Sequence, residues 1–147
     1  MNQGPPIGFL LVEASRLYRA RIDCAFEHSG LGLTAGEART LAYVNLHPAL
    51  RQSALAVRMN VEPMTLVVFL DRLEALGLIT REVDPSDRRA KLVRLTAAAG
   101  PYLDRITEAA AHARTEALAG FTSAEHTALH DFLLRIRANL ARSKDPQ

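Results

Sequence analysis

The chain has 147 residues, 48% of them hydrophobic and 23% charged, which suits a single globular domain with a modest core. No apolar run is long enough to span a bilayer, no basic leader precedes the apolar run near the N-terminus, and a single cysteine excludes an internal disulfide framework. We therefore expect a cytoplasmic protein, and the net charge of +2 alone does not indicate nucleic-acid binding.

The first predicted helix begins after the Pro5–Pro6 pair, which the first turn of a helix tolerates, and ends near Ser29–Gly30. Its apolar residues follow helical spacing: Ile7, Leu10, Leu11, Ala14, Leu17, Tyr18, Ile22 and Phe26. Cys24 lies late in this helix, beside Phe26, and we expect it to be a buried, inert thiol rather than an oxidant sensor.

Three shorter helices are predicted next. The first spans about 34–47, because Thr34 and Glu37 form a capping box at its start and Pro48 stops it. The second spans about 52–59, and the third runs from about 63 to 76, where a glycine ends it.

The apolar period then changes to that of strands. Leu78–Val83 and Lys91–Thr96 are short and partly alternating, and they flank Asp84–Ala90, whose proline and aspartates favour a turn. The sequence therefore predicts a β-hairpin with a long, charged tip. The positive charge of the chain gathers here, since residues 51–96 carry eight basic and six acidic side chains whereas the flanking segments are neutral.

Two long helices complete the prediction. The fifth follows the hairpin with an irregular first turn at Gly100–Pro101, and its apolar residues are Leu103, Ile106, Ala110, Ala113, Ala117 and Phe121. The sixth begins with a second capping box, Thr122–Glu125, and its predicted inward residues are Leu129, Phe132, Leu133, Ile136 and Leu140. The tail from Ser143 is expected to fray.

The order of these elements predicts an α+β, mostly helical fold: a winged helix-turn-helix with long N- and C-terminal dimerisation helices. Residues 34–99 would form the DNA-binding lobe, and residues 1–33 and 100–147 the dimerisation region. The fourth helix would enter the major groove, while the hairpin, or wing, would reach the phosphates or the minor groove. A twofold dimer would place two such helices one helical turn apart, matching a palindromic operator of double-stranded DNA.

Two parts of this region resemble the MarR family of transcriptional regulators, particularly its SlyA-like branch. The stretches that carry the resemblance are Ser53–Ala56 and Val61–Leu66 in the helix-turn-helix, and Leu76–Arg81, Asp84–Lys91 and Leu95–Thr96 in the wing. The resemblance implies an obligate homodimer that represses genes near its own. It also implies release of DNA when a small aromatic or anionic effector binds between the DNA-binding lobes and the dimer region.

The candidate DNA-binding residues lie on the fourth helix and the wing: Pro63, Met64, Thr65, Val68, Arg72, Arg88, Arg89 and Lys91. In relatives a wing arginine enters the minor groove, which the resemblance assigns to Arg88 or Arg89. Asp87 would repel phosphate, so we assign it an internal role, holding Arg89 or loop amides. Relatives commonly have arginine where this chain has Val68, which predicts an A·T-rich or shape-dependent operator, or weaker binding.

Tyr18, Phe26, Tyr43 and His47 are candidates for an effector pocket, although they fit the core equally well. His126 and His130 have metal-compatible spacing, but a solvated helix face is the preferred interpretation, so no metal and no cofactor are predicted. No catalytic motif stands out, and we do not expect an enzyme. The alternative function is a winged-helix protein-interaction module that has lost DNA recognition, for which the apolar Met64 and Val68 argue.

Overall fold

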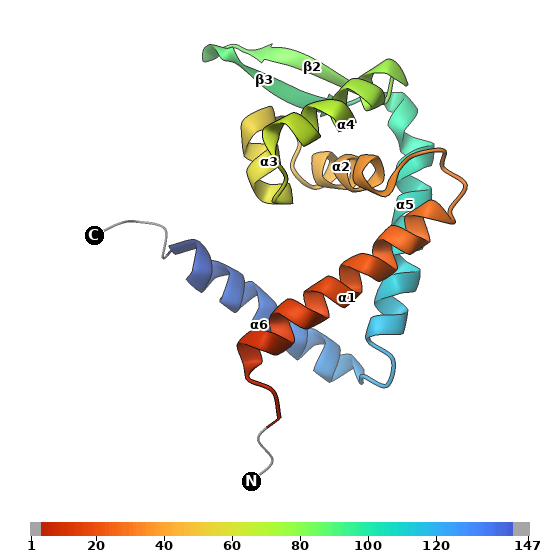
Figure 1. Cartoon of the computed structure of the whole chain (residues 1–147), viewed down its shortest axis with the longest axis vertical. Coiled ribbons are helices and arrows are strands. Elements are labelled where there is room, and N and C mark those ends of the chain that lie inside the picture. Colours follow the sequence, from red (N-terminus) through yellow and green to blue (C-terminus); the bar gives the residue numbers. More distant parts are fainter. Residues whose placement is uncertain (1–3, 143–147) are drawn as a thin grey trace. The chain divides into compact units, whose positions relative to one another are not determined.

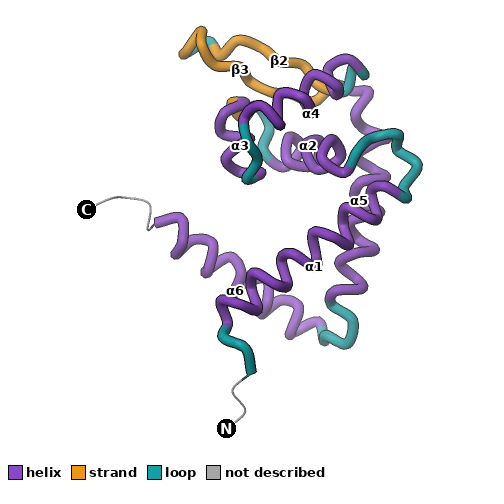
Figure 2. The backbone as a smooth tube through the Cα atoms, viewed as in Figure 1, coloured by secondary structure: helices purple, strands orange, loops and turns teal. Residues whose placement is uncertain are grey.

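The computed structural model describes residues 4–142, which form six α-helices and one three-stranded sheet (Figure 1). In chain order the elements are α1 (Ile7–Glu27), α2 (Ala35–Leu46), β1 (Leu50–Arg51), α3 (Gln52–Met59), α4 (Pro63–Ala75), β2 (Ile79–Asp84), β3 (Asp87–Leu95), a 3₁₀ turn (Ala97–Ala99), α5 (Gly100–Ala117) and α6 (Ser123–Arg142). The chain divides into two compact units, and the boundary along the chain lies between Ala113 and Arg114. Helices dominate both units, and the strands are confined to the first (Figure 2). The predicted α+β, mostly helical winged-helix fold is confirmed.

Both predicted capping boxes are present. The Thr34 hydroxyl accepts a hydrogen bond from the Glu37 amide at 3.2 Å, and the Glu37 carboxylate accepts one from the Thr34 amide at 3.0 Å. Thr122 and Glu125 form the same pair of bonds at 3.1 and 3.2 Å. Each box satisfies two amides that have no partner inside the helix, which explains why α2 and α6 begin where the sequence predicts.

The core of the first unit lies between α2, α4 and the sheet. Leu66, Leu70 and Leu73 share one face of α4 and are fully buried in a cluster with residues of α2, α3 and the strands. Helices α2 and α4 approach closely at Gly36, where any side chain larger than hydrogen would overlap the ring of Phe69. Figure 1 shows the consequence: α4 lies between α2 and the hairpin, so the helix that precedes the wing is fixed from both sides.

The sheet has the order β1-β3-β2 and is antiparallel throughout. Strand β1 was not predicted, because two residues are too few to display a period. The long hairpin tip predicted over Asp84–Ala90 is wrong: β2 extends to Asp84 and β3 begins at Asp87. The pairs Val83–Lys91 and Asp84–Asp87 are consecutive, so three residues of β3, Arg88 to Ala90, have no partner on β2 and form a bulge.

Apolar side chains remain uncovered on the first turns of α1. Ile7 and Phe9 are each 73% exposed, and the buried residue of this helix, Phe26, lies in its last turn. Cys24 is exposed, so the expected buried thiol is wrong. The reason is geometric, because two residues of an α-helix turn through about 200° and Cys24 therefore points away from the side on which Phe26 is buried.

Helix α6, taken by itself, buries no residue. Its predicted inward stripe includes Phe132 and Leu133, which are 55% and 47% exposed. The sequence therefore predicted correctly which residues form the apolar face of α6. The expectation that this face is buried within one chain is wrong. The frayed tail expected from Ser143 lies outside the described residues.

Between residues 4 and 142 no single helix is both long and apolar enough to cross a membrane. Helices α3 and α4 satisfy the length and composition only as a pair bent by 112°. Several of their apolar residues, including Leu55 and Leu70, are buried in the core.

Candidate nucleic-acid interface

The outward face of α4 is apolar in its first two turns. Pro63 occupies the first helical position, where its missing N–H costs nothing, and the helix then exposes Met64 and Val68 by 75% and 65%. Thr65 and Arg72 are also exposed on this helix. The structure therefore brings the five candidate residues of α4 to solvent, and Met64 and Val68 lie on the side opposite its buried leucines.

An ion-pair cluster joins α4 to the start of the wing. Arg81 of β2 lies with one guanidinium nitrogen 2.7 Å from Asp71 and 2.9 Å from Glu74, both on α4. The hydrogen bond from Arg81 lowers the pKa of the Glu74 carboxyl, and the same contact with Glu74 raises the pKa of Arg81. Sequence analysis missed this role of Arg81, because the chain spacing does not reveal which helix a strand residue faces. The cluster fixes the orientation of the wing relative to α4.

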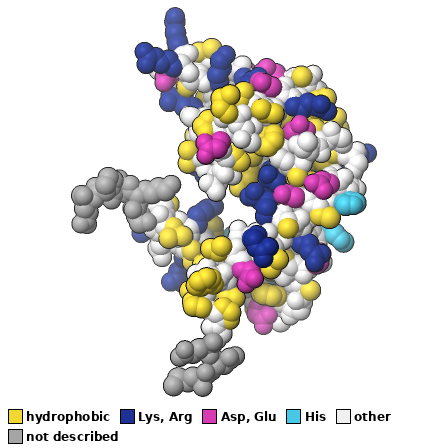
Figure 3. Space-filling view, viewed as in Figure 1, with side chains coloured by type: hydrophobic (Ala, Val, Ile, Leu, Met, Phe, Trp, Pro, Cys, Tyr) yellow, Lys and Arg dark blue, Asp and Glu magenta, His cyan; other side chains and the backbone are white. Residues whose placement is uncertain are grey.

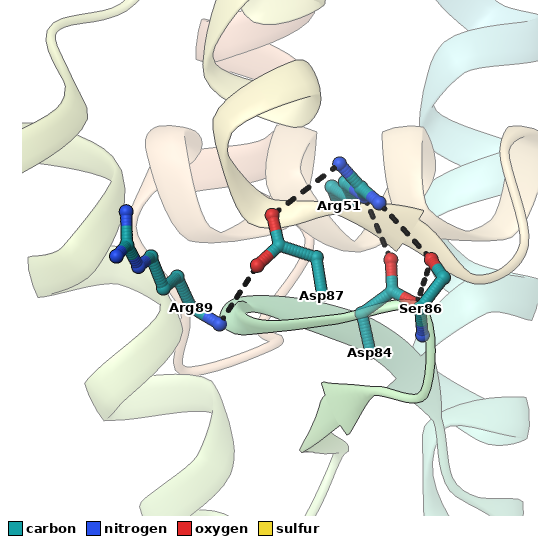
Figure 4. Close-up of polar contacts among 5 residues, drawn as sticks. All are labelled: Arg51, Asp84, Ser86, Asp87 and Arg89. Carbon is teal, nitrogen blue, oxygen red and sulfur yellow. Dashed lines mark hydrogen bonds and ion pairs between the residues drawn. The ribbon is translucent and has the colours of Figure 1, made fainter.

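The turn of the wing is closed by a buried carboxylate (Figure 4). Asp84 accepts hydrogen bonds from the Ser86 amide at 2.9 Å, the Ser86 hydroxyl at 2.8 Å and Arg51 Nε at 2.7 Å. These contacts, with those from Ser86 largest, lower the pKa of the Asp84 carboxyl. Arg51 comes from β1, directly before α3, so the bond holds the turn against the helix-turn-helix. Neither Arg51 nor Asp84 was among the residues singled out from the sequence.

Asp87 lies at the start of the bulge and contacts the backbone. One of its carboxylate oxygens accepts a hydrogen bond from the Arg89 amide at 3.0 Å, and the other lies 4.0 Å from an Arg51 nitrogen. The Arg89 side chain extends away from this cluster, as Figure 4 shows. Within residues 4–142 neither Arg88 nor Arg89 forms an ion pair, and both are exposed. By contrast, Arg94 further along β3 is paired with Glu82 at 2.9 Å.

A groove of about 370 Å³ separates the wing from the starts of α3 and α4. The residues that line it are Arg51, Gln52, Ser53, Pro63, Leu66, Asp87, Arg89, Ala90 and Lys91. Figure 3 shows Lys and Arg side chains gathered around the outer end of the hairpin. The bulge thus carries cations to the edge of a groove that also borders the first turn of α4. Such a combination fits a polyanion with a regular groove, because cations attract phosphate and the exposed helix can reach base edges.

A second cavity, of about 320 Å³, lies between α1, α2 and α5. Three of the four effector-pocket candidates line it, namely Tyr18, Phe26 and Tyr43. His47 does not, although its ring lies 6.3 Å from that of Tyr43. The cationic side chains in the lining are Arg19 and Arg39, the second of which is paired with Asp23.

The two histidines singled out from the sequence lie on the surface of α6. His126 and His130 are exposed on the helix surface, as the solvated-face interpretation requires. No group of three or more His, Cys, Asp or Glu residues suited to a metal ion occurs in the part of the chain that the structure describes.

Comparison with known proteins identifies the family. The model of the MarR family matches residues 33–91, which span the helix-turn-helix and most of the wing. The solved structure of a MarR-family transcriptional regulator from Silicibacter pomeroyi is 30% identical, with 90% of this chain and 88% of that chain covered and a TM-score of 0.77. The chain belongs to the MarR family. The resemblance inferred from the wing and helix-turn-helix motifs is thereby confirmed.

Two further solved structures support this MarR-family assignment over nearly the whole chain. A structure of MarR is 26% identical, covers 98% of this chain and 97% of that chain, and has a TM-score of 0.80. A structure of the transcriptional regulator SlyA is also 26% identical, covers 95% and 96%, and has a TM-score of 0.74. The similarity to SlyA is consistent with the predicted SlyA-like branch.

Proposed function

We propose that this MarR-family chain is a homodimeric repressor that binds double-stranded DNA at a palindromic operator and releases it in response to a small effector. It would act in the cytoplasm and perform no catalytic step. Helix α4 would supply specific contacts in the major groove, through Pro63, Met64, Thr65, Val68 and Arg72. The wing would supply affinity through Arg88, Arg89 and Lys91, with Asp87 holding its backbone.

The observation that carries this proposal is the bulge in β3. It lifts two exposed arginines out of the ladder, and neither has an acidic partner in the described chain. Other arginines of the same lobe, Arg81 and Arg94, are paired with carboxylates. Arginines that serve only to keep the surface hydrated need not gather unpaired at the edge of a groove. Unpaired arginines at such a place are attracted strongly by DNA phosphates and by the negative potential of the minor groove.

The apolar residues of α1 and α6 support a homodimer. Ile7, Phe9 and Val12 are each more than 70% exposed within the first two turns of α1, and Phe132 and Leu133 are about half exposed on α6; exposed apolar residues grouped in this way mark interaction surfaces. A second copy of the chain could cover both faces by an isologous contact, in which each copy contributes the same patch.

The cavity beside Tyr18, Phe26 and Tyr43 supports the effector. Aromatic walls favour a flat apolar ligand, and Arg19 at the same cavity favours a negative charge on it. An aromatic carboxylate fits both features. Since the cavity lies where α1 and α5 contact α2, an occupant would alter the packing between the dimerisation helices and the DNA-binding lobe. Tyr43→Ala should abolish the effect of aromatic carboxylates on DNA affinity but leave affinity without them unchanged.

The experiment that tests DNA binding is fluorescence anisotropy with the duplex upstream of the protein's own gene, beside a scrambled duplex, across a salt series. We expect tight binding to the first with a steep negative salt slope. Arg89→Ala should weaken it at least about tenfold and reduce the slope by about one. Arg135→Ala, which removes the same charge from α6, serves as the matched control and should change neither. Equal, weak binding to both duplexes would contradict the proposal.

The second candidate is a protein-interaction module without DNA specificity. The exposed, apolar Met64 and Val68 favour it, because interfaces between proteins commonly contain such residues. A partner bound with little dependence on salt would support this alternative, whereas a DNA complex must weaken as salt rises.

A further inference from the structure

Helix α4 offers few free hydrogen-bonding groups to the edges of bases. The side chains exposed in its first two turns are those of Pro63, Met64, Thr65 and Val68, of which only threonine carries a polar group. Met64 and Val68 are four residues apart, so they lie one above the other on the same face. They form the most exposed apolar pair on this helix, at 75% and 65%.

The next residue on that face, Asp71, is already engaged. Its carboxylate accepts a hydrogen bond of 2.7 Å from Arg81, and Arg81 is held in turn by Glu74 at 2.9 Å. A free aspartate can accept from the amino group of cytosine, and a free arginine can donate to guanine. One carboxylate oxygen of Asp71 is therefore occupied by Arg81, and the Arg81 guanidinium is held by two carboxylates of α4. The side-chain hydrogen-bond donors that the outward face of α4 presents are those of Thr65 and Arg72.

The C5 methyl of thymine is the one methyl group that the standard bases display in the major groove, and cytosine carries only a hydrogen at the same position. We propose that Met64 and Val68 recognise thymine methyls, so that each operator half-site is specified by the positions of thymines rather than by guanine-specific hydrogen bonds. This inference rests on the proposed DNA-binding function and names how the same surface discriminates. Burial of one methyl corresponds to about a fourfold gain in affinity.

The test replaces thymine with uracil, which removes the methyl and keeps every hydrogen-bonding group. The full-length protein first selects its preferred duplex from a random-sequence pool. The selected duplex and a copy with deoxyuridine in place of each half-site thymidine are then compared by anisotropy at one salt concentration. We expect the uracil copy to bind at least about fourfold more weakly. Uracil placed singly along the half-site should locate the contacted methyls.

Variants separate a direct contact from an effect of the methyl on DNA shape. In the double variant Met64→Ala, Val68→Ala we expect the thymine duplex to lose affinity and the two duplexes to bind equally. Val57→Ala is the matched control, because Val57 is 71% exposed on α3. It should keep the wild-type preference for thymine. If the double variant still preferred thymine, the discrimination would arise from DNA shape and the proposal would be overturned.

The remaining outcomes distinguish this inference from the proposed function. Equal, tight binding to the thymine and uracil duplexes, with both well above a scrambled duplex, would overturn methyl recognition and leave DNA binding intact. If the selection enriched no sequence and all duplexes bound equally weakly, both proposals would fall, and the face around Val68 would be assigned to a protein partner.

Discussion

The core of the winged-helix unit and the apolar face of α6 look alike in the sequence and differ in the structure. In α4, Leu66, Leu70 and Leu73 are fully buried against α2 and the sheet. In α6 the residues at equivalent helical spacing, such as Phe132 and Leu133, stay about half exposed. The same periodic pattern thus describes two kinds of surface, one completed by the chain itself and one that a second copy would complete. Each can be tested by a substitution that affects only one of them.

The largest effect is expected from Leu133→Asp. In a twofold dimer this change would bury two carboxylates without partners, at a cost on the order of several kcal/mol. We expect sedimentation analysis to show a monomer in place of a dimer, with the helix content measured by circular dichroism retained. Arg135→Asp introduces the same residue on another side of α6 and should stay dimeric. A Leu133→Asp protein that sediments as the wild type does would remove α6 from the interface.

The next effect concerns the core and uses two residues of one helix. Leu70→Ala should lower the free energy of unfolding by about 2–5 kcal/mol, because it leaves a cavity among fully buried side chains. Val68→Ala, two residues away and exposed, should change it by less than about 0.5 kcal/mol. Urea denaturation at one protein concentration measures both, since the stability of a dimer depends on concentration. Similar losses in the two variants would mean that the outward face of α4 is covered as well.

The helices could be predicted because their signals are local. A capping box needs only Thr34 and Glu37, and Gly77 with φ of 74° ends α4 in a conformation that glycine adopts without strain. The wing was predicted as a hairpin for the same reason. The register shift that produces its bulge was not, because it depends on the contacts of Asp84 with Ser86 and Arg51 and not on a local pattern.

The candidate interface was predicted to a similar extent. The exposure of Met64 and Val68 follows from the burial of the leucines on the opposite face, so helical spacing alone was sufficient. The engagement of Asp71 by Arg81 was not visible, since ten residues and a change from helix to strand separate them. Exposure of Cys24 was missed because a helix that buries residues only in its last turn gives no sign of this in its apolar count.

The smallest effect is expected from Asp84→Asn, and it depends on pH. Contacts with Ser86 and then Arg51 lower the pKa of Asp84 in the folded chain, whereas in the unfolded chain the pKa returns to about 3.9. The folded state therefore favours the carboxylate. Its contribution to stability is complete above about pH 5 and is lost as the pH falls through the folded-state pKa.

Asp84→Asn should thus be less stable than the wild type at neutral pH, and the difference should shrink steadily below about pH 4. Urea denaturation at a series of pH values measures this difference. Glu82→Gln, on the same strand, controls for the loss of a charge in an exposed pair, and its difference should be smaller at neutral pH. A difference for Asp84→Asn that stayed constant from neutral to acid pH would mean that the turn is held by the shape of the side chain and not by its charge. The bulge and its two arginines would then not depend on the ion pair with Arg51.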